Sequence, residues 1–312
     1  MRVIIDTDPG IDDTAAIFLG LAAGLEVEAV TTVFGNTDVE QCTRNALAIL
    51  EAAGRPDIPV CPGAARPLLR EPTYARAIHE QNGLGDVALP VPAQVPAAAG
   101  AVETLIDYVL RTPGEITVVA LGPLTNVALA LAAEPRVAHA VRQIVLMGGA
   151  VLTWGNVTPA ASANLYNDPE AARIVYRSGA PLVQVGLDVC RPTVISATHL
   201  ARLQQAVHPA VGLLLRITPF IQEAYRRRGI AAVVGGGVQY NDVVCMTYVL
   251  RPDLFRIRRL AVDIETQGSL TTGATVADFD GHWGRPANVD VALEVDASGV
   301  ADVFAETLLA WR

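Results

Sequence analysis

The sequence predicts an α/β protein with an open, mostly parallel and twisted sheet, flanked by helices in a Rossmann-like manner, and a helical cap in the C-terminal third. Two observations predict this class. Short apolar runs rich in β-branched residues recur along the first two thirds of the chain, and stretches with helical periodicity separate them. Parallel strands buried on both faces have this composition, and right-handed crossovers place helices on both sides of their sheet.

The expected strands and helices alternate in the first part of the chain. The apolar runs that predict strands are Val3–Ile5, Val27–Val33, Ile58–Val60, Ile116–Ala120, Ile144–Met147 and Leu182–Val185. The periodic stretches that predict helices are Thr14–Ala23, Val39–Ala53, Val102–Leu110, Leu124–Ala132 and Pro169–Tyr176. This alternation is typical of strands joined by crossover helices.

The last third of the chain loses this alternation. Helical patterns at Ala197–Val207, Pro209–Arg226 and Asp242–Leu250 predict the cap, and a glycine-rich loop at Gly235–Gly237 interrupts them. Expected edge strands near Leu260–Ile264 and Val289–Val295 and a closing helix near Val300–Trp311 complete the fold. No repeat occurs, and the Pro- and Ala-rich stretch Pro90–Gly100 is typical of a surface connection, so residues 1–312 are predicted to form a single domain.

Composition narrows the classes of partner. The 312 residues carry a net charge of −9 without a basic stripe, so neither nucleic acid nor an anionic membrane is an expected partner. The first apolar run, Val3–Ile5, is too short for a signal peptide or a membrane span, which predicts a cytoplasmic protein. The four cysteines are widely spaced and predict neither disulfides nor a zinc site.

All 23 basic residues are arginine, so the chain contains no lysine. A Schiff-base enzyme needs a lysine amine, and a Walker-type nucleotide site needs a lysine on the phosphates. The absence of lysine therefore excludes both chemistries.

An acidic segment directly follows the first expected strand. Asp6 and Asp8 fall where that strand ends, at the edge where open α/β sheets bind ligands, and Asp12 and Asp13 begin the next helix. Helix capping explains one or two of these carboxylates, since the free N–H groups of a helix start favour negative charge. Four carboxylates within eight residues repel one another unless a cation neutralises them. Oxygen ligands in an irregular arrangement favour calcium over magnesium.

Several motifs carry a resemblance to a known family. They are Asp6-Thr7-Asp8-Pro9-Gly10-Ile11-Asp12-Asp13, Thr31-Thr32-Val33-Phe34-Gly35-Asn36, Gly122-Pro123-Leu124-Thr125-Asn126, Val145-Leu146-Met147-Gly148-Gly149, Asn164-Leu165-Tyr166-Asn167-Asp168-Pro169-Glu170-Ala171-Ala172 and Asp242. In order and spacing the chain resembles the inosine–uridine nucleoside hydrolases over nearly its whole length. The resemblance implies calcium-dependent hydrolysis of the N-glycosidic bond of ribonucleosides to free base and ribose, through an oxocarbenium-like transition state.

The resemblance also implies a role for individual residues. Calcium would be held by Asp8, Asp13, the main-chain carbonyl of Leu121 and Asp242, with Asp8 also serving as the general base for the attacking water. The residues expected at the ribose are Asp12 on the 2′-hydroxyl, Asn36 among the reacting groups, Asn164 on the 3′-hydroxyl, Asn156 on the 5′-hydroxyl and Met147 against the sugar. Members of the family are commonly homodimers or homotetramers, so an oligomer is expected.

The sequence departs from the family pattern at two positions that handle the substrate. Ser162 stands where the family usually has a glutamate on the 5′-hydroxyl, which predicts weaker anchoring or room for a bulkier 5′-substituent. Asn241 stands where well-studied members have a histidine beside the leaving base, and an amide cannot supply a proton. His79 resembles a histidine that contacts the base in pyrimidine-preferring members, although a structural loop histidine is an equal alternative. Tyr225 is expected to stack on the base.

Alternatives from other classes remain open. Asp6-Thr7-Asp8 also resembles the paired aspartates of haloacid-dehalogenase-type phosphatases, but those enzymes require a lysine that this chain lacks. One alternative is a non-catalytic ribose- or nucleoside-binding protein that retains the calcium but has lost leaving-group activation at Asn241. Another is a member that retains the calcium and acts on a 5′-modified substrate. The run Arg226–Arg228 is expected to be a solvated helix end rather than a phosphate site.

Overall fold

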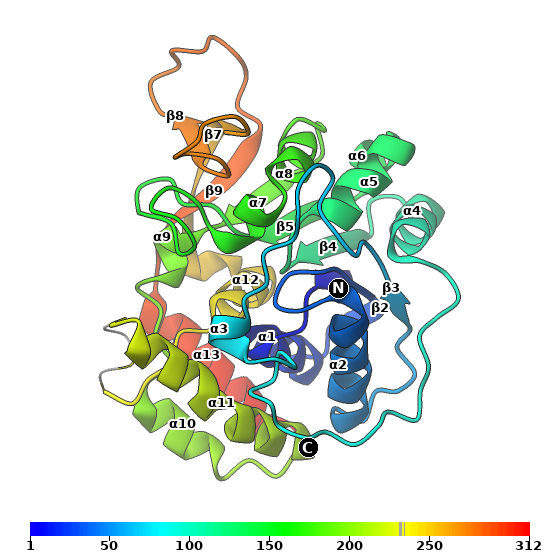
Figure 1. Cartoon of the computed structure of the whole chain (residues 1–312), viewed down its shortest axis with the longest axis vertical. Helices are drawn as coiled ribbons and strands as arrows, with labels where there is room; N and C mark the ends of the chain where they lie inside the picture. Colours follow the sequence, from blue (N-terminus) through cyan, green and yellow to red (C-terminus); the bar gives the residue numbers. More distant parts are fainter. Residues whose placement is uncertain (231–232, 234) are drawn as a thin grey trace.

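The structure is a computed structural model that describes residues 1–230, 233 and 235–312. Its centre is a nine-stranded sheet with the order β3-β2-β1-β4-β5-β6-β9-β7-β8 (Figure 1). The strands are β1 Arg2–Thr7, β2 Glu26–Thr32, β3 Val60–Pro62, β4 Ile116–Ala120, β5 Gln143–Met147, β6 Leu182–Val185, β7 Phe255–Ile264, β8 Thr275–Asp278 and β9 Val289–Val295. The pairs from β3 to β9 are parallel, and β7 pairs antiparallel with both β9 and β8. The predicted open, mostly parallel sheet is confirmed.

The helices are longest where they cross between strands or form the cap. They are α1 Ile11–Ala22, α2 Val39–Ala52, α3 Arg76–His79, α4 Ala101–Arg111, α5 Thr125–Ala133, α6 Val137–Ala140, α7 Ala163–Asn167, α8 Pro169–Tyr176, α9 Leu187–Cys190, α10 Ala197–Leu203, α11 Pro209–Arg227, α12 Asn241–Leu250 and α13 Ala297–Ala310. A short 3-10 turn, η2, covers Pro252–Leu254. None of the helices in the described ranges is both long and apolar enough to cross a lipid bilayer.

Alternate side chains of the central strands enter two separate hydrophobic clusters. In β1, Val3 and Ile5 belong to the cluster under α1, α2, α11, α12 and α13, while Ile4 belongs to the cluster under α4, α5, α6 and α8. Successive side chains of a strand point to opposite faces, so a strand covered on both sides must be apolar at every position. Figure 1 shows the two groups of helices on opposite sides of the sheet.

The strand order creates a switch point in the middle of the sheet. The chain runs outward from β1 to β2 and β3, then returns to the other side of β1 and continues through β4, β5 and β6. Open α/β sheets bind ligands in the crevice beyond the carboxyl ends of strands at such a point. Asp8 follows β1 and Leu121 follows β4, so the fold brings both residues to this crevice.

Most element boundaries agree with the sequence, and the exceptions have physical causes. β3 starts at Val60 instead of Ile58, because Ile58 supplies a buried side chain while its N–H closes a turn onto the carbonyl of Arg55. β7 starts five residues earlier than the predicted Leu260, since exposed arginines between Phe255 and Leu260 hide the strand pattern. The helix predicted to reach Val207 ends at Leu203 in a turn.

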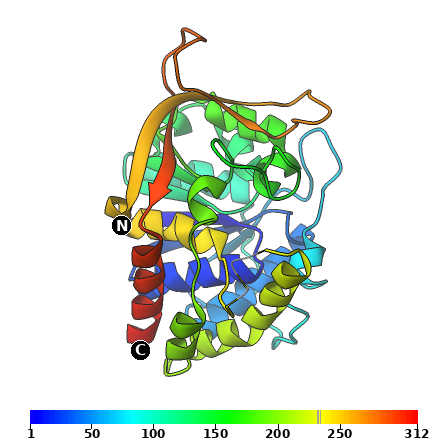
Figure 2. The same cartoon turned by 90° about the vertical axis from the view of Figure 1, so that its left-hand side faces the viewer.

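Short elements and one edge strand escaped prediction. The helices α3, α6, α7 and α9 have four or five residues each, too few for a periodic pattern. β8 pairs only with β7, in an antiparallel hairpin at the end of the sheet. Figure 2 shows β7 and β9 side by side at this end, with α13 continuing from β9.

Candidate active site

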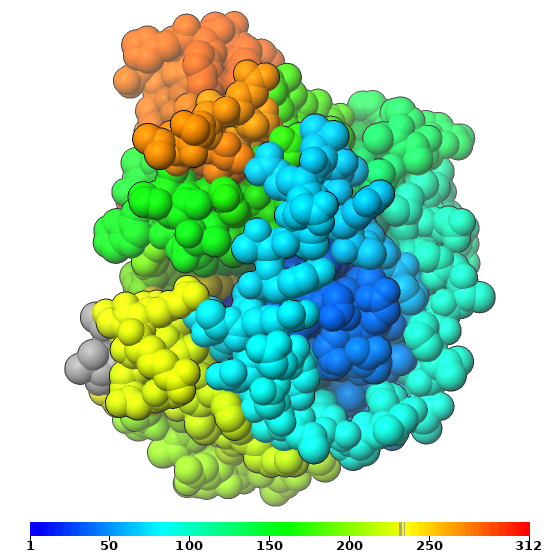
Figure 3. Space-filling view, in the orientation of Figure 1, coloured from blue at the N-terminus to red at the C-terminus, as the bar shows by residue number. Residues whose placement is uncertain are grey.

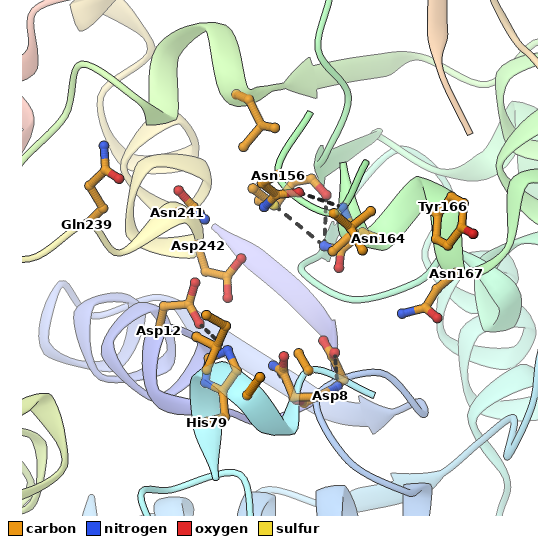
Figure 4. Close-up of a pocket in the computed structure, with 18 of the residues that line it drawn as sticks. Asp8, Asp12, His79, Asn156, Asn164, Tyr166, Asn167, Gln239, Asn241 and Asp242 are labelled. Atoms are coloured by element: carbon orange, nitrogen blue, oxygen red, sulfur yellow. Dashed lines mark hydrogen bonds and ion pairs between the residues drawn. The ribbon is translucent and has the colours of Figure 1, made fainter. Parts of the chain in front are cut away.

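A cavity of about 270 Å³ opens at the carboxyl ends of the central strands. Figure 3 shows it as a hollow where the cyan, green and yellow segments meet. Of the residues predicted for the site, those that line it are Asp8, Asp12, Asn36, His79, Leu121, Met147, Asn156, Asn164, Tyr225, Asn241 and Asp242. Asp13 and Ser162 are not among the lining residues. Segments more than 200 positions apart in the sequence thus share one cavity wall (Figure 4).

Three buried carboxylates lie together at the floor of this cavity, two of them lining it and Asp13 directly behind them. Asp12, Asp13 and Asp242 each offer an oxygen, and these oxygens lie within 4.8 Å of one another. Asp12 and Asp13 are in the first turn of α1, and Asp242 is in the first turn of α12, which packs against α1. Burial raises the pKa of Asp12 to about 6, and burial with the charge of Asp12 raises the pKa of Asp13 to about 6. Burial and the charges of its neighbours raise the pKa of Asp242 well above its usual range.

Asp8 and Asn36 form the connection between this group and strand β1. The main-chain N–H of Asn36 donates to Asp8 Oδ2 at 2.7 Å, and the side-chain amide of Asn36 donates to the Asp8 carbonyl at 3.0 Å. The same amide reaches Asp13 Oδ2 at 2.9 Å. Burial, and then the charge of Asp13, raise the pKa of Asp8 well above its usual range. Asn36 therefore holds two acidic side chains close to each other without neutralising either.

Two glycines make room for the Asp8 carboxylate. A Cβ at Gly35 would lie 2.0 Å from Asp8 Oδ2, and a Cβ at Gly122 would lie 2.6 Å from Asp8 Oδ1. Gly35 also has a φ of 159°. These contacts explain physically why glycines occur in the Thr31–Asn36 and Gly122–Asn126 motifs.

The other two aspartates of the acidic segment have structural contacts. Asp13 accepts from the Thr7 hydroxyl at 2.5 Å and from the Gly10 N–H at 2.9 Å, so it caps α1 as well as facing the cluster. Asp6 lies within β1, away from the cavity lining, and accepts from Thr31 and Asn126 at 2.6 and 2.8 Å. The acidic segment thus combines sheet, cap and cavity roles, and Asp13 is the member whose carboxylate accepts the N–H of the capping residue Gly10.

His79 closes the cavity above Asp12. Its Nδ1 accepts the N–H of Ile11 at 3.1 Å, which places the ring proton on Nε2, 3.8 Å from Asp12 Oδ1. Burial lowers the pKa of His79 to about 4, so the ring is neutral near pH 7. His79 therefore presents an N–H donor beside Asp12 and contributes no positive charge.

The wall opposite the aspartates carries amides and a thioether. The side-chain amide of Asn164 donates to the carbonyls of Leu121 and Met147, which leaves its oxygen to accept from a ligand. Asn156 has the reverse arrangement, because its oxygen accepts the N–H of Ala163 at 2.8 Å and its NH₂ group remains as a donor. Met147 is buried beside them.

Ser162 lies beside the cavity and is not among its lining residues. Its side chain is buried, and its hydroxyl accepts the N–H of Gly149 at 2.7 Å, so it stabilises the turn after β5. Of the two side chains predicted near the 5′-hydroxyl, Asn156 is the one that lines the cavity.

The cavity also includes residues that the sequence did not single out. The polar and aromatic ones among them include Thr73, Tyr74, Tyr166, Arg191 and Gln239, and Arg228 from the arginine run also lines the cavity. Arg226 and Arg227 are exposed and pair with Glu223, as expected for a solvated helix end, whereas Arg228 lines the cavity. Arg191 directly follows α9, close to the carboxyl end of β6. This position near a strand end is the sequence feature that could have identified it as a cavity residue.

The donor set of the acidic cluster fits a hard divalent cation. Its side-chain donors are carboxylate oxygens, which are the ligands that calcium and magnesium prefer. Within residues 1–230, 233 and 235–312, no arginine pairs with Asp8, Asp12, Asp13 or Asp242 within 4.0 Å. Buried like charges without a partner are costly, so this arrangement calls for a cation.

Comparisons with known proteins agree with the motifs. The model of the inosine-uridine preferring nucleoside hydrolase family matches residues 3–302. The pyrimidine-specific ribonucleoside hydrolase RihA of Salmonella gallinarum is 39% identical, over 99% of this chain and 98% of its own. Uridine nucleosidase 1 of Arabidopsis thaliana is 40% identical, over 99% of this chain and 93% of its own. The solved structure of a purine-preferring ribonucleoside hydrolase from Gardnerella vaginalis superimposes with a TM-score of 0.93 at 31% identity, over 99% of each chain.

The substitution Gly35→Ala tests the fit of the Asp8 carboxylate. The added methyl group would meet Asp8 Oδ2, so we expect the free energy of unfolding to fall by about 1–3 kcal/mol. The control is Gly212→Ala in α11, where a Cβ meets nothing within 4 Å and the change should be neutral or slightly stabilising. Urea unfolding followed by circular dichroism measures both, and equal midpoints would contradict the assigned contact.

Proposed function

The chain belongs to the inosine-uridine preferring nucleoside hydrolase family, and from this premise we propose that it hydrolyses ribonucleosides to free base and ribose with a calcium ion held at the acidic cluster. The observation that carries the proposal is the convergence of Asp12, Asp13 and Asp242 beside Asp8 at the switch point of the sheet. A cavity with this floor suits a small polar molecule with several hydroxyl groups.

We assign calcium to Asp8, Asp13, Asp242 and the carbonyl of Leu121. Asp12 belongs to the same group of carboxylates, and we assign it to the 2′-hydroxyl. When bound, calcium would hold the ribose diol and lower the pKa of the attacking water. A diol held in this way favours ribose over deoxyribose, because loss of the 2′-hydroxyl leaves Asp12 without its partner.

Asp8 is the proposed general base. Its Oδ2 is engaged by the Asn36 N–H, so Oδ1 is the atom that would take the proton of the water. Positive charge develops on the ribose ring as the N-glycosidic bond breaks, and the carboxylates of Asp8 and Asp12 are placed to stabilise it. Asn36 holds Asp8 in position, and Asn164 offers its amide oxygen to the 3′-hydroxyl.

The side chains assigned to the leaving base are neutral, and Arg228 lines the cavity close to two of them, His79 and Tyr225. Asn241 and the Nε2–H of His79 can donate hydrogen bonds, and Tyr225 offers a ring for stacking. Neither Asn241 nor a neutral His79 supplies a proton as a general acid near pH 7. Bases that depart without protonation should therefore be the better leaving groups. The named relatives include pyrimidine-specific and purine-preferring enzymes, and His79 is the feature that favours a pyrimidine here.

Further proposals concern the 5′ position and assembly. Because Ser162 is turned away from the cavity, a substituent larger than a hydroxyl at the 5′ position is compatible with the wall. A nucleoside-binding protein without catalysis is the second candidate, and the neutral amide at Asn241 is the observation that favours it. A homodimer or homotetramer remains a prediction from the family, and a cytoplasmic location remains a prediction from the shortness of the first apolar run.

Calcium should stabilise the protein through Asp242. At about a hundred times its dissociation constant, calcium should add about 2.7 kcal/mol of stability and raise the melting temperature by several degrees. Asp242→Asn should lose this response, and its calcium-free form should melt no lower than the calcium-free wild type, since one repelling charge is gone. Differential scanning fluorimetry with calcium or EDTA measures this, with exposed Asp107→Asn as the control. A full calcium response in Asp242→Asn would contradict the ligand assignment.

Substitution of Asp8 should remove the general base. Asp8→Asn keeps an oxygen for the Asn36 N–H but cannot take a proton, so we expect kcat to fall by about 10²–10⁴-fold. The assay follows release of p-nitrophenol from p-nitrophenyl riboside, with Asp253→Ala as a control at an exposed aspartate. Near-normal kcat in Asp8→Asn, with calcium still bound, would show that another group activates the water.

A leaving group that needs no proton separates hydrolysis from simple binding. We expect wild-type protein to cleave p-nitrophenyl riboside and to cleave inosine with a kcat/KM at least about 100-fold lower, because Asn241 cannot protonate a purine. Asn241→His should raise inosine cleavage, while Gln205→His on the surface should not. If neither compound is cleaved although ribose binds, the non-catalytic candidate replaces the hydrolase.

A further inference from the structure

The segment Val151–Val157 carries Asn156 to the cavity wall and has no regular secondary structure. Packing holds only part of it: Val151 contacts the hydrophobic core and Gly155 is buried, but Leu152 is 67% exposed and Trp154 is 65% exposed. Loops of this kind need specific hydrogen bonds to keep one conformation. The bonds to the segment come mainly from two places, the turn that follows it and the short helix α9.

Asp188, inside α9, holds the beginning of the segment. One of its carboxylate oxygens accepts the N–H of Leu152 at 2.6 Å, and the other accepts the N–H of Val151 at 3.0 Å. Both oxygens of an ionised carboxylate are thus used on adjacent backbone donors. Hydrogen bonds to a charged acceptor are about twice as strong as neutral ones.

Arg191, at the other end of α9, holds the residues next to Asn156. Its Nη2 donates to the carbonyl of Gly155 at 2.7 Å and to that of Trp154 at 3.1 Å. Its guanidinium also lies 4.5 Å above the Trp154 ring. In the part of the chain that the structure describes, Arg191 forms no ion pair within 4.0 Å of a carboxylate, although the charge of Asp188 acts on it at longer range.

The segment closes on itself at Gly155 and Asn156. The N–H of Gly155 donates to the Pro159 carbonyl at 3.0 Å, and a Cβ at Gly155 would lie 2.1 Å from the carbonyl oxygen of Ala161. The Asn156 amide is oriented by the Ala163 N–H, which occupies its oxygen. Its NH₂ group is therefore the one that a ligand meets, once the segment itself is held in place.

We infer that Asp188 and Arg191 form a clamp that fixes the segment Val151–Val157 and thereby positions the Asn156 NH₂ group for the 5′-oxygen of the substrate. Both are positioning residues, because their hydrogen bonds go to the segment. The Asn156 NH₂ group is the donor that they position, and neither Asn156 nor Arg191, which also lines the cavity, offers a carboxylate there. The 5′ end of the cavity thus favours a substituent that accepts a hydrogen bond over one that carries a 5′-ammonium group. The inference rests on the proposed function for the identity of the ligand.

The test compares substrates that differ only at the 5 position of ribose. For Arg191→Ala, kcat/KM on p-nitrophenyl riboside should fall about tenfold, mainly through KM, as expected for one lost hydrogen bond. On the 5-deoxy analogue the loss should be at most about twofold, since that compound has no oxygen for Asn156. Asp188→Asn should show the same pattern, Arg191→Lys should restore part of the loss, and Arg142→Ala is the control at an exposed arginine.

Equal losses on the two substrates, or no loss on either, would overturn the inference. A second measurement does not depend on turnover: isothermal calorimetry of methyl β-D-ribofuranoside and its 5-deoxy analogue, both locked as furanoses, with the calcium-loaded protein. The wild type should prefer the sugar with the 5-hydroxyl, and Arg191→Ala should lose that preference. If turnover is absent but this pattern holds, the hydrolase proposal fails and the clamp stands. If the wild type binds both sugars equally, or neither, the clamp has no role in 5′ recognition and the inference is wrong.

Discussion

Repulsion among buried carboxylates is the constraint on which the rest of the site depends. Asp8, Asp12, Asp13 and Asp242 lie beside one cavity, and burial with mutual repulsion keeps their pKa values raised. Such a group is stable only if other contacts of the fold hold the four side chains in place and if a cation neutralises their charge. Several contacts hold the side chains in place. The clearest are the hydrogen bonds of Asn36 to Asp8 and Asp13 and the space that two glycines leave for the Asp8 carboxylate.

The same constraint divides the cavity into two halves with different chemistry. The floor is acidic, with its side chains on the starts of α1 and α12 and in the loops after β1 and β2. The opposite half contains amides, a neutral histidine, a tyrosine and two arginines, some on the helices α3, α7, α11 and α12 and the others in the segments between elements. In the proposed reaction, the floor would stabilise a positive charge on ribose, while His79, Asn241 and Tyr225 would only donate hydrogen bonds to the base or stack on it. Under this proposal, sugar recognition and leaving-group release are separable properties of the chain.

Connecting segments close the site, and each is tied to a strand end or a short helix. The segment before α3 is attached to α7 and α8, where Asn167 accepts the N–H of Thr73 and Asp168 accepts the N–H of Leu68. The segment after β5 is attached to α9 by Asp188 and Arg191. Short helices that are too brief to show in a sequence pattern thus act as anchors for the cavity walls.

The sequence by itself determined the fold class and the floor of the site. Strands that are apolar at every position, with helical patterns between them, predict a parallel sheet covered by helices on both faces. Aspartates between the end of a strand and the start of a helix predict the acidic cluster. The long helices and β4, β6 and β9 were placed within a few residues. Only the tertiary structure decided that Asp6 is part of the sheet, that Ser162 stabilises a turn, and that Arg228 separates from the two arginines before it. The physical reason is the sequence distance between interacting residues. Periodicity and strand-end position are properties of neighbouring residues, whereas a hydroxyl or guanidinium finds its partner on a segment that comes near only in the folded structure.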